Sequence, residues 1–184
     1  MTVEYTPFKG LVIYVPAVYT DERGSFKESF SLRKFKDSLG FEAQFVQDNE
    51  STSRYGVIRA LHSQGGKYAQ AKLVRVSKGR VLDVVVDVRK DEPTFGKCFS
   101  VELSSQNNKH MFIPRGFLHG FSVLSDTAIF NYKCDNYFMP SSEISVHYAD
   151  PELDIDWKIP KEDQIISTKD SISPSFSQFL KGLL

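Results

Sequence analysis

Short runs of apolar residues follow one another along most of the chain, and this pattern constrains the fold more than any other feature. Alternation with a period of two indicates a strand buried on one face, and a short continuous apolar run indicates a strand buried on both faces. Many such runs with almost no helical spacing between them predict an all-β sandwich or barrel. The predicted strands are Leu11–Val15, Phe45–Asp48, Val57–His62, Ala71–Ser77, Val81–Val88, Cys98–Leu103, Met111–Pro114, Phe121–Leu124 and Ile129–Lys133.

Two segments have helical spacing instead. Ser31–Leu39 carries apolar residues about one turn apart, and Gly40 after it is typical of a helix end. Near the C-terminus, Ser173-Pro174 can begin a helix with one apolar face. That face consists of Phe176, Phe179, Leu180, Leu183 and Leu184. It must pack either on the barrel of the same chain or on a partner subunit.

Length and composition fit one cytoplasmic domain. The chain has 184 residues, 41% of them hydrophobic, and a formal net charge of zero, so no general field favours nucleic acid or a membrane surface. No apolar run approaches the roughly 20 residues of a membrane span, and the first residues lack a signal-peptide pattern. We expect one domain over residues 1–184, with a barrel core at about 43–150 and a covering segment at about 151–184. Cys98 and Cys134 are expected to be buried thiols.

Among the four histidines, His62 has the neighbours that a catalytic base needs. Alternation along Gly56–His62 places His62 on one face with Ala60, while Arg59 lies on the other face. A histidine inside a barrel among small and apolar side chains can have a tuned pKa, although buried structural histidines are common. Arg59 reaches the same pocket only if the strand twists or bulges.

Two strand residues are further candidates. Lys72 interrupts an apolar run, and a tight hairpin at Lys78-Gly79 would bring it diagonally opposite Asp83. The alternative is a cross-strand ion pair on a solvated face. Tyr132 lies in the run Ile129–Lys133, where it is either part of the core or a proton donor.

The segment Pro114–Phe121 is similar to the second motif of cupin barrels, in which a proline–glycine turn directs a histidine, here His119, into the barrel mouth. The first cupin motif would supply metal ligands as His-x-His, but this chain reads His62-Ser63-Gln64. A catalytic metal usually has at least three protein ligands. We therefore expect a barrel that works without a metal or another cofactor.

Together these stretches resemble the dTDP-4-dehydrorhamnose 3,5-epimerase family, over nearly the whole chain. The motifs are Asp21–Gly24, Phe45–Asn49, Arg59–His62, Gln70–Val76, Pro93–Lys97, Ile113–Phe117, His119–Phe121, Tyr132–Cys134, Asp154–Trp157 and Lys169-Asp170. The resemblance implies a cupin-type double-stranded β-helix, or jelly-roll barrel, with short flanking helices and assembly as a homodimer. It also implies an isomerase that epimerises dTDP-4-dehydro-6-deoxy-D-glucose at C3 and C5 to dTDP-4-dehydro-L-rhamnose in deoxysugar synthesis.

The resemblance also implies roles for particular residues. His62 is the general base, Asp170 the carboxylate that orients it, Tyr132 the acid on the opposite sugar face and Lys72 the cation beside the enolate. Asp83 is implied as the partner of Lys72. Residues implied to bind the nucleotide and the sugar are Arg23, Phe26, Glu28, Gln47, Asn49, Arg59, His119, Tyr137, Glu143 and Lys169.

The chemistry explains why these residue types are needed. A ketone at C4 acidifies the hydrogens on C3 and C5, because loss of either gives an enolate with its charge on O4. Inversion removes a proton from one face of the ring and returns one to the other, so two groups must flank the ring. A histidine with a pKa near about 6.5 suits the base, and a tyrosine with a pKa near about 10 stays protonated. A lysine at O4 stabilises charge as it develops.

The family usually reads Arg-Gly-Leu-His-Tyr-Gln around the base, whereas Ala60 and Ser63 stand here in place of the glycine and the tyrosine. Three functions stay open from the sequence. The chain is a double epimerase, a single-site epimerase (at C3 or C5) or keto-isomerase on a related nucleotide sugar, or a binding module without activity. The acid–base residues disfavour the last, and only the products separate the first two.

Overall fold

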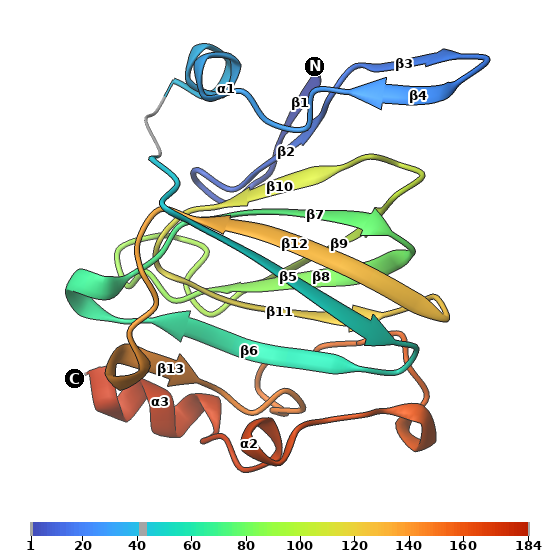
Figure 1. Ribbon diagram of the computed structural model, residues 1–184. Coiled ribbons are helices and arrows are strands. Elements are labelled where there is room, and N and C mark those ends of the chain that lie inside the picture. Colours follow the sequence, from blue (N-terminus) through green and yellow to red (C-terminus); the bar gives the residue numbers. More distant parts are fainter. Residues whose placement is uncertain (1, 41–43, 184) are drawn as a thin grey trace.

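Two antiparallel sheets packed face to face form the body of the molecule, shown for residues 2–40 and 44–183 of a computed structural model (Figure 1). The first sheet has the strand order β1 (Thr2–Tyr5), β2 (Val12–Val15), β10 (His110–Ile113), β7 (Lys72–Lys78), β12 (Thr127–Cys134) and β5 (Gln47–Arg54). The second has the order β13 (Glu143–Ser145), β6 (Ile58–Gln64), β11 (Phe117–Val123), β8 (Arg80–Asp87) and β9 (Cys98–Ser104). The predicted all-β jelly-roll barrel is therefore confirmed.

Shorter elements flank the sheets. A two-stranded arm, β3 (Val18–Asp21) and β4 (Gly24–Lys27), extends from the barrel beside helix α1 (Leu32–Leu39) (Figure 1). At the opposite side lie α2 (Thr168–Ser171) and α3 (Phe176–Leu183). The remaining turns are η1 (Gly66–Tyr68), η2 (Pro140–Ser142) and η3 (Lys161–Asp163). No helix in the described parts of the chain is long and apolar enough to span a membrane.

Apolar side chains from both sheets fill one end of the barrel. Val74, Val85, Leu103, Met111 and Phe130 are at most 1% exposed and belong to one contiguous cluster between the sheets. Burial of such side chains stabilises the fold by about 1.5–3 kcal/mol each. The other end of the barrel holds polar side chains and an open cavity.

The predicted tight hairpin at Lys78-Gly79 is wrong. β7 pairs with β10 and β12 in the first sheet, whereas β8 pairs with β9 and β11 in the second, so the turn joins the two sheets. Gly79 has a φ of 75°, and a Cβ there would lie 2.1 Å from the carbonyl oxygen of Thr127. A hairpin and a turn that joins two sheets look alike in sequence. In both cases the flanking strands bury an inner face, and in both cases the turn needs a glycine.

Two other predictions need correction. The strand predicted at Phe45–Asp48 begins at Gln47 and continues to Arg54, through polar residues without an apolar run. Cys134 is buried as predicted, but Cys98, at the start of β9 on the edge of the second sheet, is exposed. In both cases an edge strand carries fewer apolar side chains and more solvent contact than a central strand.

Both predicted helices are confirmed. α1 begins after Ser31, whose side chain accepts a hydrogen bond from the Lys34 N–H, and ends at Gly40 with a φ of 70°. In α3, Phe176 is buried and Phe179 and Leu180 pack against the apolar cluster outside the second sheet, so the predicted stripe lies on its own barrel. The side chains of Leu39 and Leu183, and all of Leu184, lie outside the described residues.

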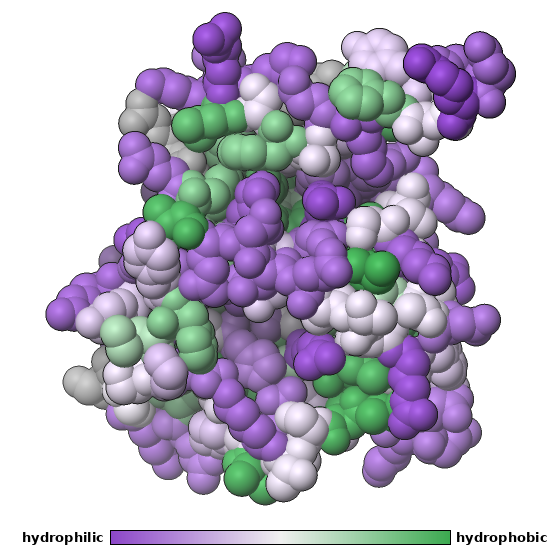
Figure 2. Space-filling view, in the orientation of Figure 1, coloured by the Kyte–Doolittle hydropathy of each residue, from purple (hydrophilic) through white to green (hydrophobic). Residues whose placement is uncertain are grey.

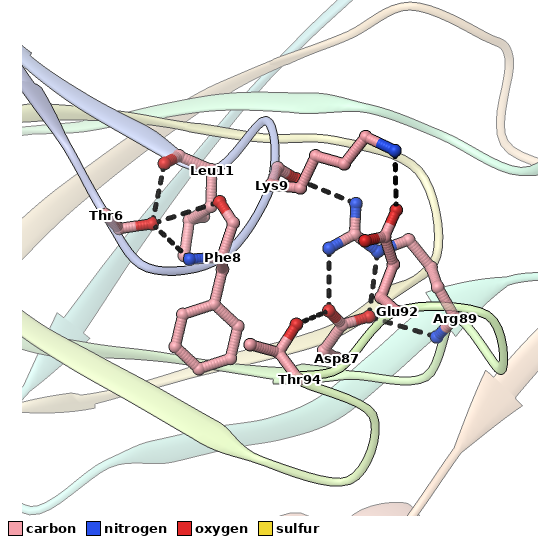
Figure 3. A network of polar contacts seen from close by, with 8 residues as sticks. All are labelled: Thr6, Phe8, Lys9, Leu11, Asp87, Arg89, Glu92 and Thr94. Atoms are coloured by element: carbon pink, nitrogen blue, oxygen red, sulfur yellow. Dashed lines mark hydrogen bonds and ion pairs between the residues drawn. The ribbon is translucent and has the colours of Figure 1, made fainter.

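A buried ion pair fastens the N-terminal loop to the filled end of the barrel (Figure 3). The Arg89 guanidinium donates to both oxygens of the Asp87 carboxylate at 2.8 and 2.6 Å, and the Thr94 hydroxyl donates to it at 2.6 Å. Arg89 also donates to the Lys9 carbonyl at 2.8 Å and lies 4.4 Å above the Phe117 ring. These contacts hold the pKa of Asp87 below its usual range, although burial opposes the shift.

Candidate active site

A cavity of about 690 Å³ opens at the polar end of the barrel, between β5 of one sheet and β6 of the other. Figure 2 shows this face hollowed near its middle, with mostly hydrophilic residues around the hollow. The structure brings together ten of the predicted site residues in the lining. They are Gln47, Asn49, Arg59, His62, Lys72, His119, Tyr132, Glu143, Lys169 and Asp170.

His62 and Asp170 form a hydrogen-bonded pair at the wall of this cavity. The Nε2 atom of His62 lies 2.7 Å from Oδ1 of Asp170, which is 4% exposed. Burial opposes ionisation of Asp170, but hydrogen bonds from His62 and from the Ser167 side chain outweigh it and hold the pKa of Asp170 below its usual value. An ionised Asp170 accepts a hydrogen bond from Nε2–H, which leaves the Nδ1 lone pair of His62 available as a base.

The end of the chain carries Asp170 to His62. Ile165 forms a parallel bridge with Val57, and its backbone exchanges hydrogen bonds with Gly56 and Ile58. Gly56 has a φ of 83°, and a Cβ there would lie 2.1 Å from the Asp163 carbonyl oxygen, so only glycine allows this approach. Ser167 then caps α2, whose buried residue is Asp170.

An irregularity in β6 places Arg59 and His62 in the same cavity. His62 pairs with His119, but Arg59 pairs with Phe121, so three residues of β6 span two residues of β11. The predicted alternation is therefore wrong for Ala60, which is fully buried, packs against Gly120 and does not line the cavity. Its replacement of the family's glycine leaves the lining unchanged.

Lys72, His119 and Asp83 form a polar chain that begins in the cavity lining with Lys72 and His119 and ends at the fully buried Asp83. His119 Nε2 lies 3.0 Å from an Asp83 oxygen, and Lys72 Nζ lies 3.5 Å from His119 Nδ1. Because the carboxylate accepts from Nε2–H, Nδ1 is free to accept from Lys72. His119 thus stands between the two residues that the resemblance pairs directly. Burial lowers the pKa of Lys72, and the negative charges of Asp83 and Glu143 partly oppose that shift.

Tyr132 enters the cavity from the sheet opposite His62. Tyr132 lies on β12 of the first sheet and His62 on β6 of the second, and both line the cavity. Burial raises the pKa of Tyr132, so its phenol stays protonated at neutral pH. Lys72 Nζ lies 5.9 Å from the centre of the Tyr132 ring. Behind them, the stacked rings of Phe121 and Phe130 make an apolar floor, with centres 4.2 Å apart.

Polar side chains surround the cavity mouth. Arg59 donates through Nε and Nη2 to the Ser53 hydroxyl at 3.2 Å, and Gln47 donates to the Asn49 side chain at 3.0 Å. Lys169 of α2 and Glu143 of β13 form an ion pair at the mouth, on the side of the second sheet. Such a rim can hold an anionic, hydrogen-bonding ligand.

Four predicted binding residues lie away from the cavity lining. Arg23 and Phe26 are exposed on the arm, where Arg23 pairs with Asp21, and Glu28 follows the arm and pairs with Lys34. Tyr137 is 65% exposed on the loop after β12, although the next residue, Phe138, does line the cavity.

Sequence reasoning missed several lining residues. They are Ser51, Ser63, Gln64, Gln70, Cys134, Phe138 and Ser167. A polar period of two along β5 could have found one of them, because Gln47, Asn49, Ser51 and Ser53 point to the same side of the strand. In the described parts of the chain, no three histidine, cysteine, aspartate or glutamate side chains are grouped to hold a metal ion, and the metal-free reaction stays a prediction.

A jelly-roll barrel whose cavity holds a histidine–carboxylate pair, a facing tyrosine and a buried lysine defines a cupin-fold acid–base enzyme. The dTDP-4-dehydrorhamnose 3,5-epimerase family model matches residues 5–178, and the chain belongs to this family. The protein of that name from Shigella flexneri is 45% identical over 170 residues, 92% of this chain and 93% of its own length.

Two solved structures support the same assignment. The dTDP-4-dehydrorhamnose 3,5-epimerase from Elizabethkingia anophelis is 52% identical and superposes with a TM-score of 0.92, over 97% of each chain. The dTDP-6-deoxy-D-glucose-3,5-epimerase from Legionella pneumophila, in complex with dTDP-4-keto-L-rhamnose, is 44% identical with a TM-score of 0.94, over 100% of this chain and 96% of its own.

Proposed function

We propose that this chain epimerises dTDP-4-dehydro-6-deoxy-D-glucose at C3 and C5 to dTDP-4-dehydro-L-rhamnose, as a step of L-rhamnose synthesis. Family membership and the bound product of the Legionella relative support the substrate. The observation that carries the proposal is that His62 and Tyr132 line one cavity from opposite sheets. A base and an acid so placed can act on opposite faces of one sugar ring, which inversion requires.

His62 is the base in the proposed reaction. Its Nδ1 lone pair takes the proton from C3 or C5, the C–H electron pair forms the enolate, and the negative charge moves to O4. Asp170, 2.7 Å from Nε2, stabilises the imidazolium that forms. Tyr132 then donates its phenolic proton to the same carbon from the other face, and the electron pair returns from O4. Exchange with water restores the protonation states of both residues.

Lys72 is placed to stabilise the enolate oxygen. It is buried beside the floor of the cavity, where a hydrogen bond to a developing anion is stronger than in water. His119 and Asp83 orient its ammonium group, because Nδ1 of His119 accepts a hydrogen bond from Lys72 and Asp83 holds the His119 ring. The interaction grows as charge develops on O4, so it stabilises the transition state of the reaction more than it strengthens substrate binding.

The rim residues are proposed to hold the nucleotide. The Arg59 fork matches the geometry of phosphate oxygens, and Gln47, Asn49, Glu143 and Lys169 offer further hydrogen bonds around the mouth. The Lys169–Glu143 ion pair lies at the mouth, so a diphosphate can replace Glu143 as the partner of Lys169.

Deuterium uptake tests the proposal directly. The protein is incubated with dTDP-4-dehydro-6-deoxy-D-glucose in heavy water, and the label is located by mass and by NMR. Label at both C3 and C5 with an L-configured product is the expected result. Label at one carbon would make the chain a single-site epimerase, and no label with intact nucleotide binding would make it a binding module.

We also propose that the chain acts as a homodimer in which the arm of one copy completes the cavity of the other. Arg23 and Phe26, which resemble substrate-binding residues, lie on an arm that projects from its own barrel (Figure 1). Phe26 and Tyr19 are 69% and 66% exposed there, which is unusual for large aromatic side chains on a monomer. A partner's barrel would cover them.

Complementation between two inactive variants tests this arrangement. His62→Ala disables the cavity but keeps the arm, and Arg23→Ala disables the arm but keeps the cavity. Mixed dimers would contain one intact site made from both chains, so a random mixture should regain about a quarter of wild-type activity. Absence of recovery in mixtures shown to exchange subunits, or a monomer by sedimentation, would overturn the dimer proposal.

The remaining proposals concern organisation and location. We propose that residues 1–184 form one domain, which the family match over residues 5–178 and the contact between His62 and Asp170 support. We propose a cytoplasmic location, since Cys98 and Cys134 are unpaired, as is usual in a reducing compartment.

A further inference from the structure

The loop that follows β12 is held by the side-chain amides of Gln47, Gln64 and Gln70 from other elements and by its own Asn136, which donates to the Lys67 carbonyl at 3.0 Å. Its backbone is in no regular structure between Asn136 and Met139. The Phe138 N–H donates to Gln47 Oε1 at 3.0 Å, and the Asn136 carbonyl accepts from Gln70 Nε2 at 2.7 Å. Backbone groups of a loop that lacks a strand partner need such contacts. The position of the loop therefore depends on these few amides.

Gln64 makes the most extensive of these contacts. Its Oε1 accepts from the Met139 N–H at 2.6 Å, and its Nε2 donates to the carbonyls of Tyr137 at 3.4 Å and Tyr68 at 3.2 Å. The side chain is 6% exposed, so water cannot easily replace it. A single amide thus joins the end of β6, the η1 turn and the loop.

The loop carries one aromatic ring that lines the cavity and a second ring next to it in sequence. Phe138 lines the cavity and is 49% exposed, and Tyr137 before it is 65% exposed. Neither ring is packed in the core, so both would be free to move if the backbone of the loop were not fixed. Exposed aromatic rings held in place at a pocket mouth suit a flat, uncharged ring such as a nucleobase.

We propose that Gln64 is a positioning residue for nucleotide recognition, which fixes the Tyr137–Met139 backbone so that the two rings are preorganised to receive the base. The proposal rests on the proposed function, which supplies the nucleotide. Gln64 acts through the loop and leaves the reacting atoms untouched. His62, two residues earlier on β6, is held independently by Asp170 and by its pairing with His119 and Ser145.

Replacement of Gln64 by leucine tests the proposal, because leucine keeps much of the volume and loses all three hydrogen bonds. We expect the Kd for thymidine diphosphate, measured by calorimetry, and the KM for the nucleotide sugar to rise about tenfold, the weakening expected when a preorganised binding surface is released. The kcat at saturating substrate should stay within about twofold, since the base and the acid are undisturbed. Amide hydrogen exchange at Phe138 and Met139 should accelerate at least tenfold in the unliganded protein.

Thr94→Val serves as the matched control. Thr94 is also buried and also donates a hydrogen bond, to Asp87 at the filled end of the barrel, so its loss reduces stability without reaching the loop. This variant should lower the Tm and leave the Kd, KM and loop exchange unchanged.

Either of two results would overturn the proposal. One is a Gln64→Leu protein that is less stable but binds thymidine diphosphate like the wild type. The other is unchanged exchange at Phe138 and Met139, which would mean that the remaining contacts fix the loop alone. If the wild-type protein itself fails to bind thymidine diphosphate, the proposed function fails, while the exchange measurement still decides whether Gln64 holds the loop.

Discussion

Replacement of Asp170 by asparagine should reduce the rate of proton exchange about 10²- to 10³-fold. The carboxylate lies 2.7 Å from His62 Nε2 and can only accept a hydrogen bond there, which keeps the base lone pair on Nδ1. An asparagine can instead donate its amide N–H to Nε2 and so favour the tautomer with the proton on Nδ1. Recovering the active tautomer then means giving up a hydrogen bond worth about 1.5 kcal/mol.

The missing charge adds a second effect. As His62 takes a proton it becomes an imidazolium, and at about 4 Å between charge centres the carboxylate stabilises it by at most about 4 kcal/mol in a protein environment. The His62 side chain is 28% exposed, so we take about half of this value. The two effects sum to about 3–4 kcal/mol, and each 1.36 kcal/mol changes the rate about tenfold.

Asp150→Asn is the matched control for this prediction. Asp150 is as deeply buried as Asp170 and accepts hydrogen bonds from the backbone of Phe176 at 2.8 Å and Glu152 at 2.9 Å. Its replacement should lower the Tm without slowing exchange. Rates are read from deuterium incorporation at saturating substrate, with thymidine diphosphate affinity measured in parallel. An Asp170→Asn rate within threefold of wild type, at unchanged affinity, would refute the tautomer argument.

Three further perturbations separate the other parts of the molecule. Tyr132→Phe should keep part of the deuterium exchange and lose inversion, and unchanged product configuration by NMR would exclude the acid role. Asp83→Asn removes a charge that raises the pKa of Lys72, so the alkaline limb of the kcat profile should move to lower pH, with kcat at neutral pH about tenfold lower. Asp87→Asn should destabilise the barrel by about 3 kcal/mol at pH 7, measured by urea unfolding, with little change in kcat. Because the pKa of Asp87 is lower in the folded protein than in the unfolded chain, Asp87 stabilises the fold fully above the ordinary carboxyl pKa. That stabilisation is lost as the pH falls through the folded pKa. The variant should therefore lose less stability than the wild type as the pH is lowered below about 4.

The strands could be predicted from the sequence where burial leaves a simple pattern. β8 and β12 bury at least one face, and their apolar residues locate them. Only the last part of β11 was predicted, because His119 and Gly120 interrupt the apolar run of a strand that begins at Phe117 and not at Phe121. β5 was placed too short, since it is an edge strand whose inward residues are polar and line the cavity. The corner at Gly79 could not be told from a hairpin, because pairing partners are a property of the whole sheet.

The site divides in the same way. The resemblance located His62, Asp170, Lys72 and Tyr132, and the structure gathers all four in one cavity. Periodicity gave the wrong face for Ala60, because the irregular pairing of β6 with β11 shifts the alternation by one residue. The contacts of Gln64 had no signal in the sequence. Two of them join segments more than 70 residues apart, and no period or turn pattern connects a loop to an amide so distant.

The contacts in the cavity between residues far apart in the sequence also determine when the chain first becomes able to react. Asp170 meets His62 from 108 positions further along the chain, and Lys72 meets His119 across 47. Contacts this remote in sequence form slowly and late, because each closes a long loop. A chain still emerging from the ribosome lacks the carboxylate that orients its base until residue 170 has been added. During refolding, the return of deuterium exchange should therefore coincide with docking of the C-terminal segment and serve as a clock for the final step of assembly.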